Sequence, residues 1–184
     1  MSPTSLKKAC QSPYYCPNLV EAGEKYCKAC RAKEQSRKSI TIVCGPPSSG
    51  KSAYVFKQAR PGDLIVDLDL IWQALSGMPR NERPMELFPF VLAVRDELYR
   101  QLEKPNEIER AWIIAGLPTA KEREHLSKRL GGKIVLLKVQ AEECMKRITN
   151  DGKRKDKDIE RYWKPMIDKW WKLYEPSDKD EVIE

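Results

Sequence analysis

A short apolar segment that runs directly into a glycine-rich loop constrains this chain more than any other feature. Residues 40–44 (ITIVC) are apolar and mostly β-branched, and the next eight residues match the pattern G-x-x-x-x-G-K-[ST]. This phosphate-binding loop, the P-loop, consists of Gly45, Pro46, Pro47, Ser48, Ser49, Gly50, Lys51 and Ser52. Residues 53–60 can continue as a helix, and strand, loop and helix in this order are the context that the motif requires.

The P-loop predicts binding of ATP or another nucleoside triphosphate. Glycines let successive backbone N–H groups curl around a polyphosphate, and the N-terminus of the following helix adds the positive end of a dipole. Lys51 is expected to reach the β- and γ-phosphates, and Ser52 is expected to ligate Mg²⁺.

The rest of the chain alternates between short apolar runs and helical patterns. The sequence predicts strands at 64–66, 111–115 and 133–139, helices at 68–75, 85–102, 119–130 and from 141, and a short edge strand at 181–184. Thr119 and Gly131 are the expected caps of the third of these helices. Repeated strand–helix units predict an α/β fold, in which residues 40–184 form a doubly wound parallel sheet with helices on both faces. Ligands of such sheets bind at the carboxyl ends of the strands.

Four of the six cysteines lie close together near the N-terminus, with the spacing C-x5-C-x10-C-x2-C. In a chain without signs of secretion, this grouping favours metal ligation over two disulfides or four inert thiols. Four thiolates suit a tetrahedral, structural Zn²⁺. The expected ligands are Cys10, Cys16, Cys27 and Cys30. We therefore expect a small zinc module, similar to a zinc ribbon or treble clef, over residues 1–35, and a linker over 36–39.

The positive charge is concentrated in two segments. The 184 residues carry a formal net charge of +7, and residues 1–39 hold eight basic and three acidic side chains. Residues 146–157 hold six basic and two acidic side chains. This distribution is compatible with contact with a polyanion such as DNA or RNA, and a solvated basic surface explains it equally well. No apolar run approaches the ~20 residues that span a bilayer, so we expect no membrane partner and a cytoplasmic location. The sequence leaves the oligomeric state open.

Residues 40–184 resemble the small P-loop kinases of the polynucleotide-kinase, zeta-toxin and nucleotide-kinase group. The resemblance rests on the P-loop, on Asp67 and Asp69 after the second strand, and on the basic segment after the fourth strand. With the cysteine module included, the chain looks most like zinc-ribbon-plus-P-loop proteins of phages. The resemblance implies a phosphotransferase that acts on a hydroxyl of a nucleic-acid end or a nucleotide, with the zinc module docking the nucleic acid.

Each acidic residue after the second strand has an expected role under this resemblance. Asp69 would be the catalytic base, and Asp67 would bind Mg²⁺ directly or through water. Alternatively, Asp69 would only cap the following helix. The chain departs from the polynucleotide-kinase pattern at Trp72, where the family has an arginine that holds a substrate phosphate. Trp72 would then stack on a base or belong to the core, and Arg80, Arg83 or Arg95 would supply the missing charge.

The basic segment at about 146–157 is the expected lid over the phosphates. Arg147 and Arg154 are the candidates for contact with the transferring phosphoryl group, where cations stabilise developing charge. A solvated basic loop is the alternative.

An aromatic stripe at helical spacing follows the lid. Trp163, Ile167, Trp170 and Tyr174 are separated by four, three and four residues. This spacing favours a core face over a platform for base stacking.

Two other functions are alternatives to the kinase. The first is a nucleic-acid-stimulated ATPase or a nucleotide-dependent switch. The predicted strand at 111–115 weakens this alternative, because it lacks a terminal acidic residue. In the second alternative, the protein binds nucleic acid and its P-loop is not catalytic.

Overall fold

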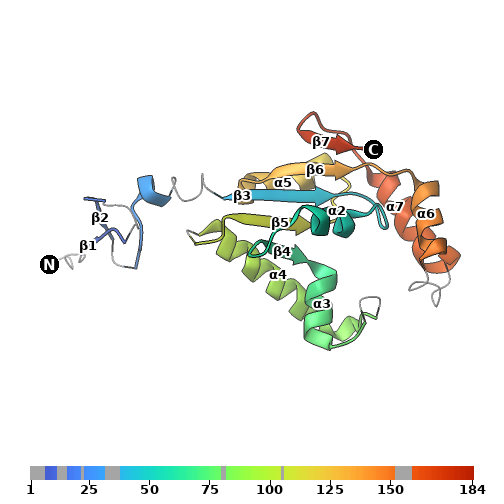
Figure 1. The fold of residues 1–184 in the computed structure, drawn as a ribbon, viewed down its shortest axis with the longest axis horizontal. Helices are drawn as coiled ribbons and strands as arrows, with labels where there is room; N and C mark the ends of the chain where they lie inside the picture. The colour runs from blue at the N-terminus through green and yellow to red at the C-terminus, as the bar shows by residue number, and fades with distance from the viewer. Residues whose placement is uncertain are drawn as a thin grey trace.

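A five-stranded parallel sheet forms the centre of the protein (Figure 1). The computed structural model describes residues 7–11, 16–21, 23–31, 38–79, 82–104, 106–151 and 159–184. The strand order is β4-β5-β3-β6-β7, and every neighbouring pair is parallel. The strands are β3 (Ser39–Cys44), β4 (Leu64–Asp67), β5 (Arg110–Ile114), β6 (Lys133–Leu137) and β7 (Asp180–Ile183).

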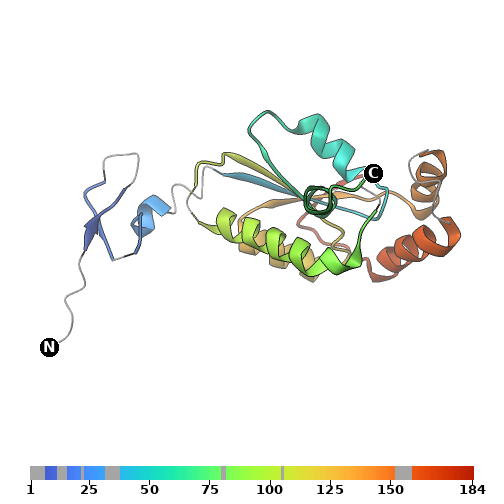
Figure 2. The ribbon, with the colours of Figure 1, turned by 90° about the horizontal axis from the view of Figure 1, so that it is seen from below.

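Helices cover both faces of the sheet, which confirms the predicted doubly wound α/β fold. Figure 2 shows α2 on one face and α4 with α5 on the other. The helices are α2 (Lys51–Gln58), α3 (Leu68–Ser76), α4 (Phe88–Glu103) preceded by the 3₁₀ turn η1 (Met85–Leu87), α5 (Ala120–Leu130), α6 (Ala141–Asn150), and α7 (Lys164–Leu173) preceded by the π-helical turn η3 (Ile159–Trp163). In the described part of the chain, no helix combines the length and apolarity needed to cross a membrane.

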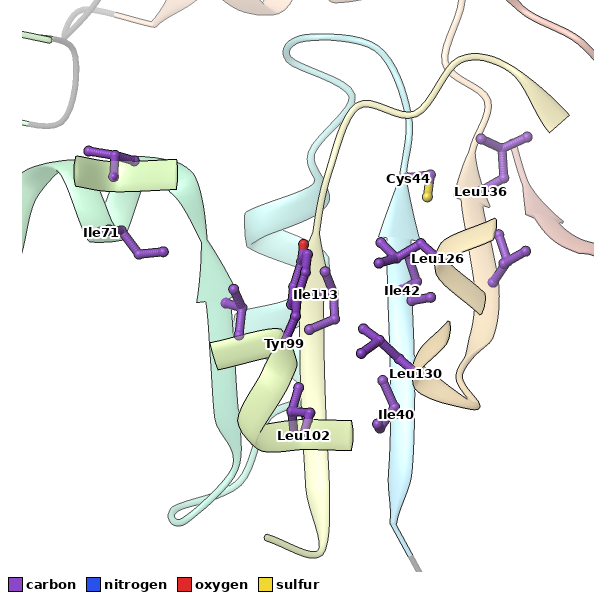
Figure 3. Packing of buried hydrophobic residues seen from close by; sticks show 14 of the residues in the cluster. Ile40, Ile42, Cys44, Ile71, Tyr99, Leu102, Ile113, Leu126, Leu130 and Leu136 are labelled. Atoms are coloured by element: carbon purple, nitrogen blue, oxygen red, sulfur yellow. The ribbon is translucent and has the colours of Figure 1, made fainter. Parts of the chain in front are cut away.

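The two faces of the central strand β3 enter different cores, because successive side chains of a strand point to opposite sides. Ile40 and Ile42 lie on the face that α5 covers, near Leu126 and Leu130 (Figure 3). Val43, on the other face, belongs to the cluster that includes residues of α2. Burial of such an aliphatic side chain contributes about 1.5–3 kcal/mol, so both layers hold β3 and the loop that follows it in place.

Local capping signals set the ends of two helices. The Thr119 hydroxyl accepts from the backbone of Glu122 and the Glu122 carboxylate accepts in return, so the predicted cap of α5 is a full capping box. Gly131, with φ 70°, ends the same helix. The N-terminal cap of α3 is not Asp69, the residue that the alternative above considers as the cap. Asp67 Oδ1 accepts the backbone N–H of Asp69 at 2.9 Å, so Asp67 is the cap and Asp69 lies in the first helical turn.

Two short strands mark the cysteine-rich N-terminal segment. β1 (Lys8–Ala9) pairs antiparallel with β2 (Leu19–Val20). Residues 32–37, which include part of the expected linker, lie outside the described residues. The Lys38 ammonium group donates to the Leu102 carbonyl at 3.1 Å, near the end of α4. β3 begins at Ser39, one residue earlier than the predicted strand.

Candidate active site

The P-loop borders a cavity of about 760 Å³ at the carboxyl ends of the parallel strands. This is the position where open α/β sheets bind ligands, and the volume is in the range of small-molecule and cofactor sites. α3, the loop after β5, the end of α6 and α7 form the remaining walls. Residues that border the cavity include Lys51, Ser52, Asp67, Asp69, Arg83, Gly116, Arg147 and Lys169.

The two glycines of the P-loop motif are required by its backbone. Gly45 has φ 148°, and a Cβ atom there would lie 2.5 Å from the carbonyl oxygen of Leu137 at the end of β6. Gly50 has φ 93° and precedes α2 in a left-handed conformation. Only glycine adopts such conformations without cost, so the motif fixes the tight turn that leads into the N-terminus of α2.

Lys51 folds back onto the P-loop. Its ammonium group donates to the carbonyl oxygens of Gly45 at 2.9 Å and Pro46 at 2.6 Å. Burial lowers the pKa of Lys51 to about 8, because a partly desolvated site disfavours the charged form. A bound phosphate would favour the charged form again, which suits a residue expected to contact the β- and γ-phosphates.

Ser52 and Asp67 fit an Mg²⁺ site. The Ser52 hydroxyl donates to Asp67 Oδ2 at 3.2 Å, and Asp67 is buried. Octahedral Mg²⁺ holds its oxygen ligands at about 2.1 Å, which places neighbouring ligands about 3 Å apart. The hydroxyl and carboxylate oxygens therefore have both the chemistry and the separation for the ion, with Ser52 at the start of α2 and Asp67 at the end of β4.

Asp69 lies in the same cavity and pairs with Arg83. Arg83 Nη2 is 2.5 Å from Asp69 Oδ1. Among the three arginines that the sequence offered in place of the family's arginine, Arg83 lines the cavity. Arg95 instead pairs with Asp96 on α4 at 2.7 Å, and Arg80 lies outside the described residues.

Trp72 is a core residue. It is 5% exposed, belongs to the cluster that includes Ile71 and Tyr99, and stacks on Phe88 with ring centroids 5.6 Å apart. The core interpretation of Trp72 is therefore confirmed and the base-stacking one is wrong, because the stack with Phe88 buries the indole.

Arg147 connects the end of α6 to the P-loop. Its Nη1 donates to the Ser49 carbonyl at 3.0 Å, and its Nε donates to Glu143 one helical turn earlier at 3.0 Å. The first of the two expected lid arginines is thus in contact with the loop that would hold the phosphates. Arg154, the second, falls with residues 152–158 outside the described residues.

The aromatic stripe of α7 and η3 is mainly core, as its spacing predicted. Trp163, Ile167 and Trp170 are buried. The Trp170 indole N–H donates to the Gly116 carbonyl at 2.9 Å, which ties α7 to the loop after β5. Trp163 and Trp170 of the stripe also border the cavity, and the stripe did not predict the three further residues of this wall: Met166, Lys169 and Leu173.

The four N-terminal cysteines converge. Their sulfur atoms all lie within 4.8 Å of one another, and those of Cys16 and Cys27 are 3.7 Å apart. Tetrahedral zinc with Zn–S distances near 2.3 Å places its sulfurs about 3.8 Å apart. The Asn18 side chain and the backbone N–H of Cys30 donate to the Cys27 sulfur and lower its pKa to about 6, which favours the ligating thiolate. Chemistry and geometry both fit zinc, and all six cysteines are free thiols.

Comparisons with known proteins show similarity in structure rather than in sequence. No protein-family model matches the chain, and no curated protein matches it. Among solved structures, the crystal structure of a gluconokinase from Sinorhizobium meliloti 1021 is similar over 80% of this chain and 82% of that chain, with a TM-score of 0.48 and 14% sequence identity.

Proposed function

We propose that this protein is an ATP- and Mg²⁺-dependent phosphotransferase that phosphorylates a hydroxyl group of a nucleic-acid end or a nucleotide. The observation that carries the proposal is the convergence of P-loop and acceptor-side groups on one cavity. Lys51 and Ser52 border it from the P-loop, and Asp69 borders it from α3. A phosphate donor and an acceptor hydroxyl must meet in just such a site, since catalysis of phosphoryl transfer is mainly positioning and electrostatics.

The chain's own residues divide the reaction between them. The acceptor oxygen attacks the γ-phosphorus, the bond from that phosphorus to the bridging oxygen breaks, and ADP leaves. Asp69 orients the hydroxyl and accepts its proton. Lys51 and Arg147 stabilise the charge on the transferring group, and Ser52 with Asp67 holds Mg²⁺. When bound, Mg²⁺ neutralises charge that develops on the phosphate oxygens.

A nucleotide or nucleic-acid acceptor suits the chemistry of the cavity walls. Lys169 on α7 and Arg83 supply cations for an anionic acceptor, while Phe56, Met166 and Leu173 supply apolar surface for a base. Phe56 and Leu173 remain 49% and 44% exposed, so this apolar surface is open to a ligand. The absence of an acidic residue at the end of β5, where Ile114 is followed by Ala115 and Gly116, speaks against water as the intended acceptor.

The direct test follows γ-labelled ATP with Mg²⁺ and an oligonucleotide that carries a 5′-hydroxyl. We expect label on the oligonucleotide, and Asp69→Asn should lower its transfer about a hundredfold, because general-base assistance contributes at least that factor. Asp96→Asn is the matched control, since Asp96 is a carboxylate on α4 that does not border the cavity. Label found only as free phosphate would reject the kinase in favour of the ATPase.

The zinc module is proposed to dock the nucleic acid through its basic side chains. We expect a zinc-specific chelator, added under reducing conditions, to abolish binding of a labelled oligonucleotide while nucleotide binding persists, because four thiolates and a metal hold so short a segment folded. Fluorescence anisotropy measures oligonucleotide binding, and restored binding with Zn²⁺ but not Mg²⁺ is the control.

Oligonucleotide binding should also weaken with salt. We expect the binding constant to fall by about 0.7 logarithmic units per phosphate contact for each tenfold rise in salt concentration. Binding that survives chelation, or ignores salt, would contradict this role.

A further inference from the structure

The carbonyl oxygen of Gly116 joins two walls of the cavity. Gly116 follows β5, and its oxygen accepts the backbone N–H of Gly45 at 3.3 Å and the indole N–H of Trp170 at 2.9 Å. A carbonyl oxygen has two lone pairs, so it can accept both donors at once. Gly45 is the first residue of the P-loop, and Trp170 belongs to α7, which Figure 1 shows beyond the carboxyl ends of the strands. The shared oxygen therefore relates the position of α7 to that of the P-loop.

The Trp170 ring is held in one orientation by its neighbours on the same helix. Trp170 is buried, stacks on Tyr174 with ring centroids 5.2 Å apart, and meets the edge of Trp171 at 5.3 Å. Packing of this kind directs the indole N–H at the Gly116 oxygen. The hydrogen bond is thus a rigid link between α7 and the loop after β5.

The loop after β5 is a fixed reference for that link. Leu117 adopts φ 39°, a conformation that is uncommon for a residue with a side chain. Arg123 Nη1 donates to the carbonyls of Leu117 and Pro118 at 3.0 and 2.7 Å, and the backbone N–H of Glu175 donates to that of Pro118 at 3.1 Å. These contacts do not depend on Trp170, so the loop should keep its shape when the indole N–H is removed.

The cavity face of α7 is centred on Trp170. It consists of Met166, Lys169, Trp170 and Leu173. Leu173 is exposed, and Lys169 is the cation of this wall. A ligand that rests on this face is therefore placed relative to the P-loop through the Trp170–Gly116–Gly45 contacts.

We propose that Trp170 is a positioning residue that aligns the acceptor with the transferring phosphoryl group. The acceptor rests against Lys169 and Leu173, the γ-phosphate lies on the P-loop, and the Gly116 oxygen sets the distance between the two. In-line transfer depends on this placement, and a misplacement of about 1 Å can cost a hundredfold in rate. The inference rests on the proposed function and assigns the acceptor to the α7 wall.

Trp170→Phe tests the alignment because it keeps an aromatic ring on α7 and removes the N–H. We expect kcat for transfer to the 5′-hydroxyl oligonucleotide to fall about ten- to a hundredfold. The KM for the oligonucleotide and the dissociation constant of ATP should stay within about threefold of wild type, since the wall residues and the bond from Gly45 to Gly116 remain. Steady-state kinetics and titration calorimetry measure these constants. A tryptophan analogue with sulfur in place of the N–H, incorporated at position 170, should reproduce the loss if the phenylalanine variant does not fold.

Trp171→Phe is the matched control. Trp171 is the next residue of α7 and also packs against Tyr174, with ring centroids 5.5 Å apart, but it does not border the cavity. Its indole N–H is buried and meets no hydrogen-bond acceptor among the residues that the structure describes. We therefore expect the same loss of ring volume to leave kcat close to wild type.

Three results would overturn the positioning role while wild-type transfer still supports the kinase. The first is an unchanged kcat in folded protein that lacks the N–H at position 170, and the second is an equal loss in Trp171→Phe. The third is a loss of ATP affinity as large as the loss in kcat, which would locate the defect in the P-loop. A wild-type protein that phosphorylates no hydroxyl would overturn both the positioning role and the proposed function.

Discussion

Replacing Lys51 with alanine is expected to lower kcat/KM for phosphoryl transfer by a factor on the order of a thousand. A preorganised cation or donor at the developing charge contributes that much in a shielded site. Lys51 is such a group, since its ammonium is held 2.9 Å from the Gly45 carbonyl inside the loop that would cradle the phosphates. Steady-state kinetics with labelled ATP measure the loss. If the P-loop were only a scaffold, the wild-type protein would show no phosphoryl transfer, and Lys51→Ala would lower only the stability of the fold.

The pH dependence of nucleotide binding provides a second measure of Lys51. Its pKa of about 8 in the free protein means that the ammonium group loses its proton as the pH rises through 8. A triphosphate favours the charged form and raises that pKa in the complex. Binding at alkaline pH is therefore coupled to proton uptake, and affinity should fall up to about tenfold per pH unit above 8. Titration calorimetry between pH 7 and 9.5 tests the slope.

Lys51→Arg is the control for the pH dependence, because a guanidinium group keeps its charge throughout this range. Its affinity, although lower, should be flat between pH 7 and 9.5. A flat wild-type profile would show that Lys51 is fully charged before the nucleotide arrives. The same slope in both proteins would assign the titration to another group.

Much of the fold could be predicted because each element carries its own local signal. The β-branched run before the P-loop, the capping box at Thr119 and the short C-terminal segment that became β7 were all expected and are present. The order of the strands could not be predicted in the same way. The strand sequences IVD, AWII and KIVLL are almost uniformly apolar, so nothing in them specifies which neighbour each one pairs with.

Residues of the cavity could be predicted where they belong to a recognisable sequence pattern. Lys51 and Ser52 belong to the P-loop motif, and Asp67 ends a predicted strand. Arg83 could be named only as one of three candidates, because it lies in the segment between α3 and η1, which has no regular sequence pattern. The apolar spacing of α7 predicted its buried stripe, but not Lys169 beside it, because spacing defines the core face better than the face that borders a ligand.

Arg123→Met is expected to lower the free energy of unfolding by about 3–5 kcal/mol, because it removes one partner of a buried ion pair and leaves the other charge unpaired. Arg123 is fully buried on α5, and its Nη2 lies 2.7 Å from Asp180 Oδ2 on β7. Its Nη1 donates to the carbonyls of Leu117 and Pro118 at 3.0 and 2.7 Å, and Nη2 donates to that of Glu175 at 2.5 Å. One side chain thus joins α5, β7, the loop after β5 and the segment after α7. Urea unfolding measures the change.

The sequence did not identify Arg123 as a buried residue, although Arg123 shares a helix face with Leu126 and Leu130, three and seven residues later. A charged residue on an apolar face signals a buried partner, and the partner here is 57 residues away. Asp180→Asn separates the ion pair from the carbonyl contacts, because Arg123 keeps its bonds to the loop and loses only the charge of its partner. We expect a smaller loss than for Arg123→Met, and a double variant less destabilised than the two single changes added together. Additive effects would mean that the two residues stabilise the fold independently. In that case the contribution of Arg123 would come from its hydrogen bonds to the carbonyls of Leu117, Pro118 and Glu175 rather than from the charge of Asp180.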